Sequence, residues 1–270
     1  FGYDAHVARS GELEIAVGRG CPQTCDYCLN PAVAGLYSGR GTWVRRRSPA
    51  SVLAEVAALR QRYPEARSVR FLDHAFALHP GWLGAFLDAW RAERGPPFRC
   101  HLRANAADAE VVSRLAAAGC RMVDVEVISG SDFIRNEIFR MELSNAQIEE
   151  TARHVRNAGI RLRAIVYAGA PYESEMSLEE TRDLLRAIRP DLADIRPYYP
   201  WPGTAARETA RENGWLHPRG EEQLHGDLPG LDIPACRPER VATFVRKLRA
   251  ELAGAGGAWW RRWRRQGWMG

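Results

Sequence analysis

Three cysteines, Cys21, Cys25 and Cys28, stand close together in the string RGCPQTCDYC. Their spacing is C-x3-C-x2-C, and no fourth cysteine follows at short range. Structural zinc sites and four-thiolate iron–sulfur clusters close their coordination shells with four ligands. Three thiolates on a four-iron cluster would instead leave one iron open, which suits catalysis. The alternative is a zinc knuckle or three buried thiols, although zinc would need a fourth ligand nearby.

Strand-like and helix-like segments alternate along the chain and must position these cysteines. Expected strands cover 13–18, 68–72, 98–103, 122–128, 161–167 and 194–198, and expected helices cover 49–63, 81–94, 107–118, 145–158, 178–188 and 204–213. Six strand–helix units predict a parallel sheet. Ligands on such sheets bind at the carboxyl ends of the strands. The cysteines follow the first strand, so they are predicted to lie at that end.

Composition restricts the class of protein. The chain has 270 residues, 46% of them hydrophobic, which is ordinary for a soluble globular protein. No apolar run reaches the length of a membrane span, and no secretory signal opens the chain. The net charge of +5 comes almost wholly from arginines spread along the chain, which does not favour a nucleic-acid partner. The other cysteines (Cys100, Cys120, Cys236) are scattered, so we expect a reducing cytoplasm rather than a disulfide framework.

The C-terminal part differs in composition from the rest. We expect one domain over residues 1–216, and then a connector, a helix over 240–252 and a Trp/Arg-rich end over 217–270. The tryptophans of the end alternate with arginines, as in segments that bind nucleic acid or membrane surfaces. A helix packed on the barrel or on a neighbouring domain is the favoured alternative, since aromatic residues at helical spacing are usually buried. The start at Phe1 indicates processing or excision from a longer protein.

The cysteine motif resembles the signature of the radical S-adenosylmethionine (SAM) superfamily, including the aromatic Tyr27 before the third cysteine. The resemblance covers residues 13–216 and is closest to the cobalamin-associated group. It implies an α/β fold, a partial (β/α)6 TIM-type barrel, here with a C-terminal helical extension. It also implies that Cys21, Cys25 and Cys28 hold a [4Fe–4S] cluster. SAM would chelate the open iron, and an electron from the cluster would cleave it to a 5′-deoxyadenosyl radical.

Further segments resemble family motifs. FLDHAF over 71–76 is similar to F-x-D-x-x-F, which implies that Asp73 receives the amino group of SAM. VISGSD over 127–132 is similar to G-I-E-S-G-S, which implies that Ser129 and Gly130 lie against SAM. GAPYE over 169–173 resembles G-x-P-x-E, which implies that Val166 and Gly169 lie near the adenine. YPWPGT over 199–204 resembles a Y-P-x-P-G-T segment.

The sequence also departs from the family pattern. Ile128 stands where the family has a glutamate, and Glu126 is expected to replace it in part, because strand alternation puts both on one face. Met141 stands where a basic residue usually lies near the SAM carboxylate, and Arg140 precedes it. Arg103 ends the third strand and is a further candidate at the barrel mouth.

The resemblance therefore implies a radical SAM enzyme that abstracts hydrogen and then transfers a methyl group to a small molecule or rearranges it. An electron donor such as flavodoxin or ferredoxin would supply the reductant. Cobalamin would belong to the full-length parent protein, since no domain fits before Leu13. The alternatives are a methylthiotransferase-like enzyme acting on RNA or protein, and a non-catalytic iron–sulfur module, which the changes at Ile128 and Met141 favour.

Overall fold

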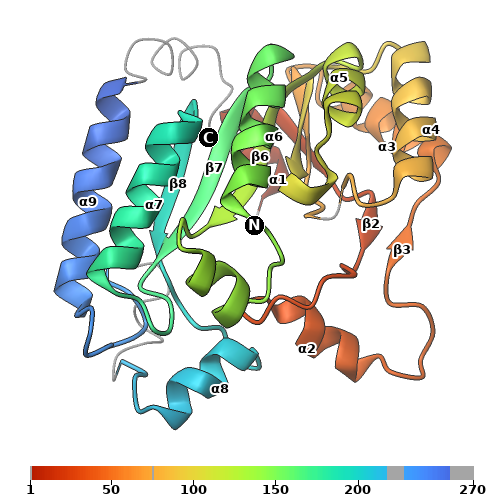
Figure 1. Ribbon diagram of the computed structural model, residues 1–270. Helices are drawn as coiled ribbons and strands as arrows, with labels where there is room; N and C mark the ends of the chain where they lie inside the picture. Colours follow the sequence, from red (N-terminus) through yellow and green to blue (C-terminus); the bar gives the residue numbers. More distant parts are fainter. Residues whose placement is uncertain (1, 75, 218–227, 256–270) are drawn as a thin grey trace.

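The computed structural model describes residues 2–74, 76–217 and 228–255 (Figure 1). A six-stranded parallel sheet forms the centre of the fold. Its order is β1 (Glu12–Ile15), β4 (Ser68–Phe71), β5 (Phe98–Leu102), β6 (Cys120–Ile128), β7 (Arg161–Ala168) and β8 (Leu192–Pro197). The connecting helices are α3 (Pro49–Arg62), α4 (Pro80–Ala92), α5 (Ala109–Ala117), α6 (Asn145–Asn157) and α7 (Glu175–Ile188). The predicted six-unit partial barrel is confirmed.

Several short elements were not predicted from the sequence. They are α1 (Tyr3–Ser10), α2 (Leu29–Leu36), the antiparallel pair β2 (Gly18–Arg19) and β3 (Arg45–Arg46), the 3-10 turn η1 (Ala104–Ala106) and the π-helix η2 (Phe133–Ile138). Each is too short to show a clear hydrophobic period. Three of them, β2, β3 and α2, lie in the long connection between β1 and α3, which also carries the cysteines.

Local sequence signals account for the longer helices. Ser48 caps α3 by accepting a hydrogen bond from the Ser51 amide at 3.2 Å, and Pro49 occupies the first helical position. Ser144 and Gln147 form a capping box at the start of α6. The helices cover one face of the sheet with a close-packed apolar layer. In that layer the Phe71 ring lies 5.3 Å from Phe86 and 5.4 Å from Trp90, centroid to centroid.

The C-terminal helix belongs to the same packed layer. After α8 (Ala205–Glu212), helix α9 (Pro238–Ala255) lies beside α7 and β8 (Figure 1). Val241 and Leu248 of α9 are buried in the common core, and Glu251 pairs with Arg186 of α7 at 2.7 Å. The division of the chain at residue 216 stays a prediction. The Trp/Arg-rich end and part of the connector lie outside the described residues.

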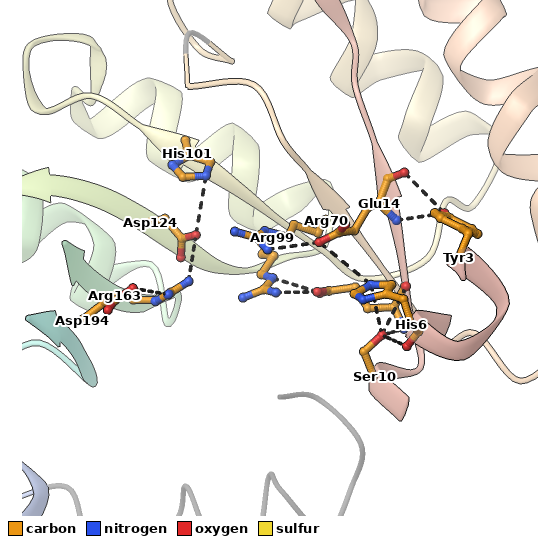
Figure 2. Close-up of polar contacts among 11 residues, drawn as sticks. Tyr3, His6, Ser10, Glu14, Arg70, Arg99, His101, Asp124, Arg163 and Asp194 are labelled. Atoms are coloured by element: carbon orange, nitrogen blue, oxygen red, sulfur yellow. Dashed lines mark hydrogen bonds and ion pairs between the residues drawn. The ribbon is translucent and has the colours of Figure 1, made fainter. Parts of the chain in front are cut away.

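The other face of the sheet is the open interior of the barrel, and its side chains are polar. Arg163 of β7 pairs with Asp194 of β8 at 2.5 Å and with Asp124 of β6 at 3.4 Å. Asp124 in turn faces His101 of β5 at 3.7 Å. Figure 2 shows this row, together with further ion pairs toward the N-terminal strand. Among the described helices, none is both long enough and apolar enough to cross a membrane.

Candidate functional site

The cysteine loop is a tight turn that leads into α2. The amide of Cys28 donates to the carbonyl of Cys25 at 3.0 Å, which closes the turn. Cys28 is also the N-cap of α2, because its sulfur accepts from the Asn30 amide at 3.4 Å. The loop follows β1 and β2 at the carboxyl end of the barrel, as the sequence predicted.

All three cysteines line one cavity of about 310 Å³ at the barrel mouth. Its wall combines sulfur, charged groups and aromatic rings from the loops after several strands. The other lining residues are Gln23, Tyr27, Leu29, Asn30, His74, Leu78, Arg103, Glu126, Tyr167, Arg196, Pro197, Tyr198, Tyr199 and Trp201. All three thiols are free. Three free thiols facing one cavity fit a three-cysteine iron–sulfur cluster, because soft thiolates are the ligands that such clusters select.

A buried cation lies beside the cysteines. Arg103 is 6% exposed, and its Nη1 lies 3.6 Å from the Cys25 sulfur. Its Nη2 donates to the Met141 carbonyl, while Nε has no partner among the described residues. Burial raises the pKa of the Cys25 thiol, and the Arg103 charge opposes that shift. The predicted site residue Arg103 thus reaches the cavity.

Backbone contacts hold the cysteine loop against the segment after η2. The Asp26 amide donates to the Phe139 carbonyl at 3.0 Å, and the Asp26 carbonyl accepts from the Ala206 amide at 3.1 Å. Arg140 pairs with the Asp26 carboxylate at 3.2 Å, with its own side chain largely exposed. Arg140 is therefore placed on the outside of the loop and does not line the cavity.

Tyr27, His74 and Glu126 form a polar cluster on the cavity wall. The Tyr27 hydroxyl donates to Glu126 Oε2 at 3.3 Å, and His74 Nδ1 lies 2.5 Å from Glu126 Oε1. The hydrogen bond to Glu126 raises the pKa of His74. Burial alone would raise the pKa of Glu126, but the His74 hydrogen bond and the nearby cations outweigh it and lower the pKa. Both shifts are in the direction that favours the charged forms of the pair.

Asp73 lies behind this cluster rather than in the main cavity. Its carboxylate accepts from the Val17 amide at 2.7 Å and faces Arg46 at 3.6 Å. It lines a smaller adjoining cavity of about 180 Å³ together with Cys21 and His74. Asp73 thus ties the end of β1 to the loop that carries His74.

Four other predicted site residues lie on the helix side of the sheet. Ser129 is buried 3.3 Å from the Thr181 hydroxyl of α7, and the Gly130 amide donates to the same oxygen at 2.8 Å. Val166 is buried, while its neighbour Tyr167 lines the cavity. Gly169 has a positive φ of 90° and packs against Pro229. The structure does not bring these four side chains to the cavity.

A β-bulge separates Glu126 from Ile128. Glu126 pairs with Ile165 of β7, but Ile128 pairs with the next residue, Val166, so the register shifts at Val127. Ile128 is therefore buried beside Val166 on the helix side, with a φ of 62°. The prediction that Ile128 and Glu126 share a face is wrong, because alternation fails at the bulge. Glu126 alone faces the cavity.

Sequence reasoning missed much of the aromatic wall. Tyr198, Tyr199 and Trp201 line the cavity. Only Tyr199 and Trp201 belong to a segment with a signal, the Y-P-x-P-G-T segment over 199–204. His74 belongs to the FLDHAF segment over 71–76, but it was not among the predicted site residues. Its place directly after a strand was the available signal.

Comparisons with known proteins agree with this geometry. The family model described as Radical SAM superfamily matches residues 15–185. A tRNA-2-methylthio-N(6)-dimethylallyladenosine synthase of Parafrankia sp. (strain EAN1pec) is 27% identical over 88% of this chain and 48% of its own length. One from Nocardia farcinica (strain IFM 10152) is 32% identical over 75% of this chain and 42% of its own length. The chain thus spans about half the length of the curated relatives it matches.

Solved structures share the fold at low identity. The radical SAM methyltransferase TsrM from Kitasatospora setae, with cobalamin and a [4Fe–4S] cluster bound, has a TM-score of 0.64 and 20% identity over 79% of this chain and 42% of that chain. Coproporphyrinogen III oxidase from Escherichia coli has a TM-score of 0.59 and 14% identity over 95% of this chain and 57% of that chain. The names of the curated relatives include tRNA, so the expected lack of a nucleic-acid partner is not supported.

Proposed function

The chain belongs to the radical SAM superfamily, and on that premise we propose that it is an enzyme domain that cleaves SAM reductively on a [4Fe–4S] cluster. The superfamily uses this cluster together with SAM. The observation that carries the proposal is the gathering of Cys21, Cys25 and Cys28 on one wall of a cavity at the barrel mouth. Cavities of this size hold small ligands.

The chain's own residues would then have distinct roles. Cys21, Cys25 and Cys28 would hold the cluster, which supplies the electron that breaks a carbon–sulfur bond of SAM. Arg103 places a positive charge beside these sulfurs and stabilises negative charge there. Glu126 presents a carboxylate to the cavity and holds His74 there.

The remaining predicted residues act through position. Asp73 fixes the loop of His74, Arg140 fixes the cysteine loop, and Tyr27 holds Glu126. Ser129 and Gly130 fix the end of β6 on α7, while Val166 and Gly169 support the end of β7. The rings of Tyr167, Tyr198 and Trp201 can stack on planar groups and exclude water.

For the reaction, we propose methyl transfer or rearrangement on a small molecule. The fold shared with the methyltransferase TsrM supports this choice. Cobalamin would be carried by another part of the parent protein, and flavodoxin or ferredoxin would deliver the electron. A cytoplasmic location remains a prediction. The second candidate is methylthiolation of tRNA, which the names of the curated relatives favour.

The test is SAM cleavage by the anaerobically reconstituted protein. With dithionite as reductant, we expect release of 5′-deoxyadenosine, which chromatography measures. Cys25→Ala should abolish both the iron absorbance and the product, whereas Cys236→Ala, outside the cavity, should retain both. An intact cluster by EPR without product would favour the non-catalytic iron–sulfur module. Zinc bound by the cysteines in place of iron would overturn both readings.

A further inference from the structure

Three potential metal ligands come together beside the cysteine cavity. His74 follows β4, His101 belongs to β5 and Glu126 belongs to β6, so neighbouring strands deliver them to one place. One ligand atom from each residue lies within 4.8 Å of the other two. The rings of His74 and His101 are 4.3 Å apart, centroid to centroid. Two imidazoles and a carboxylate form a ligand set that suits divalent transition metals.

His101 carries an unexplained buried nitrogen. The residue is 5% exposed, and its Nδ1 has no hydrogen-bond partner among the described residues. A buried polar atom without a partner is destabilising, so such an atom calls for an explanation.

A carboxylate lies near the other nitrogen of His101. Its Nε2 lies 3.7 Å from the Asp124 carboxylate, and Arg163 holds Asp124 in turn at 3.4 Å (Figure 2). Histidines that bind metals usually direct their second nitrogen to a carboxylate, which fixes the ring orientation. The row from Asp194 through Arg163 to Asp124 therefore places a carboxylate beside His101.

His74 and Glu126 are already in direct contact. Their hydrogen-bonded atoms are 2.5 Å apart, and both residues line the main cavity. A metal ion can replace the proton between them. Metal–ligand bonds of about 2.0–2.2 Å would require these ligand atoms to shift, because the His74 and Glu126 atoms are 2.5 Å apart and the three atoms lie within 4.8 Å of one another. The His74 side chain is 56% exposed and can rotate to allow this.

We propose that His74, His101 and Glu126 bind one divalent transition-metal ion, of the zinc or ferrous class, separate from the cysteine site. Three protein ligands leave at least one coordination position open, which is the pattern of catalytic rather than structural sites. Because His74 and Glu126 line the main cavity, that position would face a bound substrate. The site does not depend on the cluster, since it uses none of the cysteines.

The test measures metal content in the full chain with its cluster reconstituted. After dialysis against zinc and removal of loose metal, we expect about one zinc per chain beside about four irons, by mass spectrometry of the elements. His74→Ala, on a largely exposed side chain, and His101→Ala should each lose the zinc and keep the iron. Asp124→Asn should weaken zinc binding about 10-fold, as measured with a competing chelator.

A matched control is His154→Ala on α6. His154 also faces a glutamate, Glu150 at 3.8 Å, but lies outside the main cavity. This variant should keep the zinc. The proposal would be overturned if the unsubstituted chain bound no zinc. It would also be overturned if both His74→Ala and His101→Ala kept the zinc. Zinc lost only in Cys25→Ala would assign it to the cysteines and also overturn the proposal. A chain that binds zinc but no iron would contradict the proposed cluster and would still support the histidine site.

Discussion

The Nη1 atom of Arg103 lies 3.6 Å from the sulfur of Cys25, so a buried guanidinium stands beside the middle cysteine of the triplet. The two residues come from different strand-to-helix connections, after β5 and after β1. The second arm of the same guanidinium donates to the carbonyl of Met141. One side chain therefore joins the cysteine loop to the segment after η2 and sets the charge beside the sulfurs.

Removing this charge should make a cluster on the cysteines harder to reduce. Reduction adds negative charge to the cluster and its sulfurs. In Arg103→Met, no neighbouring guanidinium stabilises this added charge. The reduction potential should therefore fall, because net charge near an iron–sulfur cluster sets its potential. Arg103→Lys keeps the charge and should stay closer to the parent value. A potentiometric EPR titration measures both, and equal potentials in all three proteins would contradict the prediction.

Glu126→Gln should lower the pKa of His74. The hydrogen bond and the charge of Glu126 both raise that pKa, and a neutral amide supplies less of each. NMR titration of the histidine ring in iron-free protein follows the change. Tyr27→Phe is the matched control, because it removes the other hydrogen bond to Glu126 and keeps the carboxylate. A His74 pKa that is the same in the parent and in Glu126→Gln would show that the pair does not form in solution.

The long elements of the fold were predictable because their signals are local. Ser48 and Pro49 mark the start of α3, and the strand before the cysteines follows from its apolar run. The cysteine site was predictable for the same reason, since three ligands lie within one loop. Glu126 and Arg103 were named as candidates, but nothing in the sequence showed that they meet at one cavity.

The features that could not be predicted depend on how strands and helices far apart in the sequence pair with one another. A single extra residue at Val127 turns Ile128 away from the face of Glu126, and period-two reasoning has no means to detect it. The motif around Gly130 implies that the backbone there lies close to another group, and the structure shows such a close contact. Its partner, however, is the backbone of α7, 50 residues further along the chain at Glu180. Such partners depend on tertiary packing.

This packing of Gly130 gives a prediction about stability. A Cβ at this position would lie 2.3 Å from the Glu180 carbonyl oxygen and 2.4 Å from the Thr181 Cα, both backbone atoms. Gly130→Ala should therefore push α7 away and lower the free energy of unfolding by about 1–3 kcal/mol. Gly35→Ala on α2 is the control, since a Cβ there meets none of the described atoms within 4 Å. It should be neutral or stabilising by about 0.5–1 kcal/mol. Urea unfolding of both variants measures the difference, and equal stabilities would contradict the packing.

Glu173 gives the last prediction, on the pH dependence of stability. Burial raises the pKa of this carboxyl to about 7, although Ser177 and the Gly169 amide donate to it. The unfolded chain ionises near the ordinary pKa of 4.5, whereas the folded chain keeps the proton to higher pH. The stability from protonated Glu173 is therefore full below pH 4.5 and is lost as pH rises toward 7. The shift corresponds to about 3 kcal/mol at most.

Glu173→Gln should remove this part of the pH dependence. The variant loses one hydrogen-bond acceptor, so its stability is expected to be lower at pH 5, but its free energy of unfolding should change less between pH 5 and pH 8. Urea unfolding across that range measures the difference between variant and parent at each pH. Glu175→Gln is the control, because Glu175 is largely exposed and pairs with Arg240 at the surface. Parallel pH curves for Glu173→Gln and the unsubstituted protein would show that folding does not raise the pKa of Glu173, and would contradict the prediction.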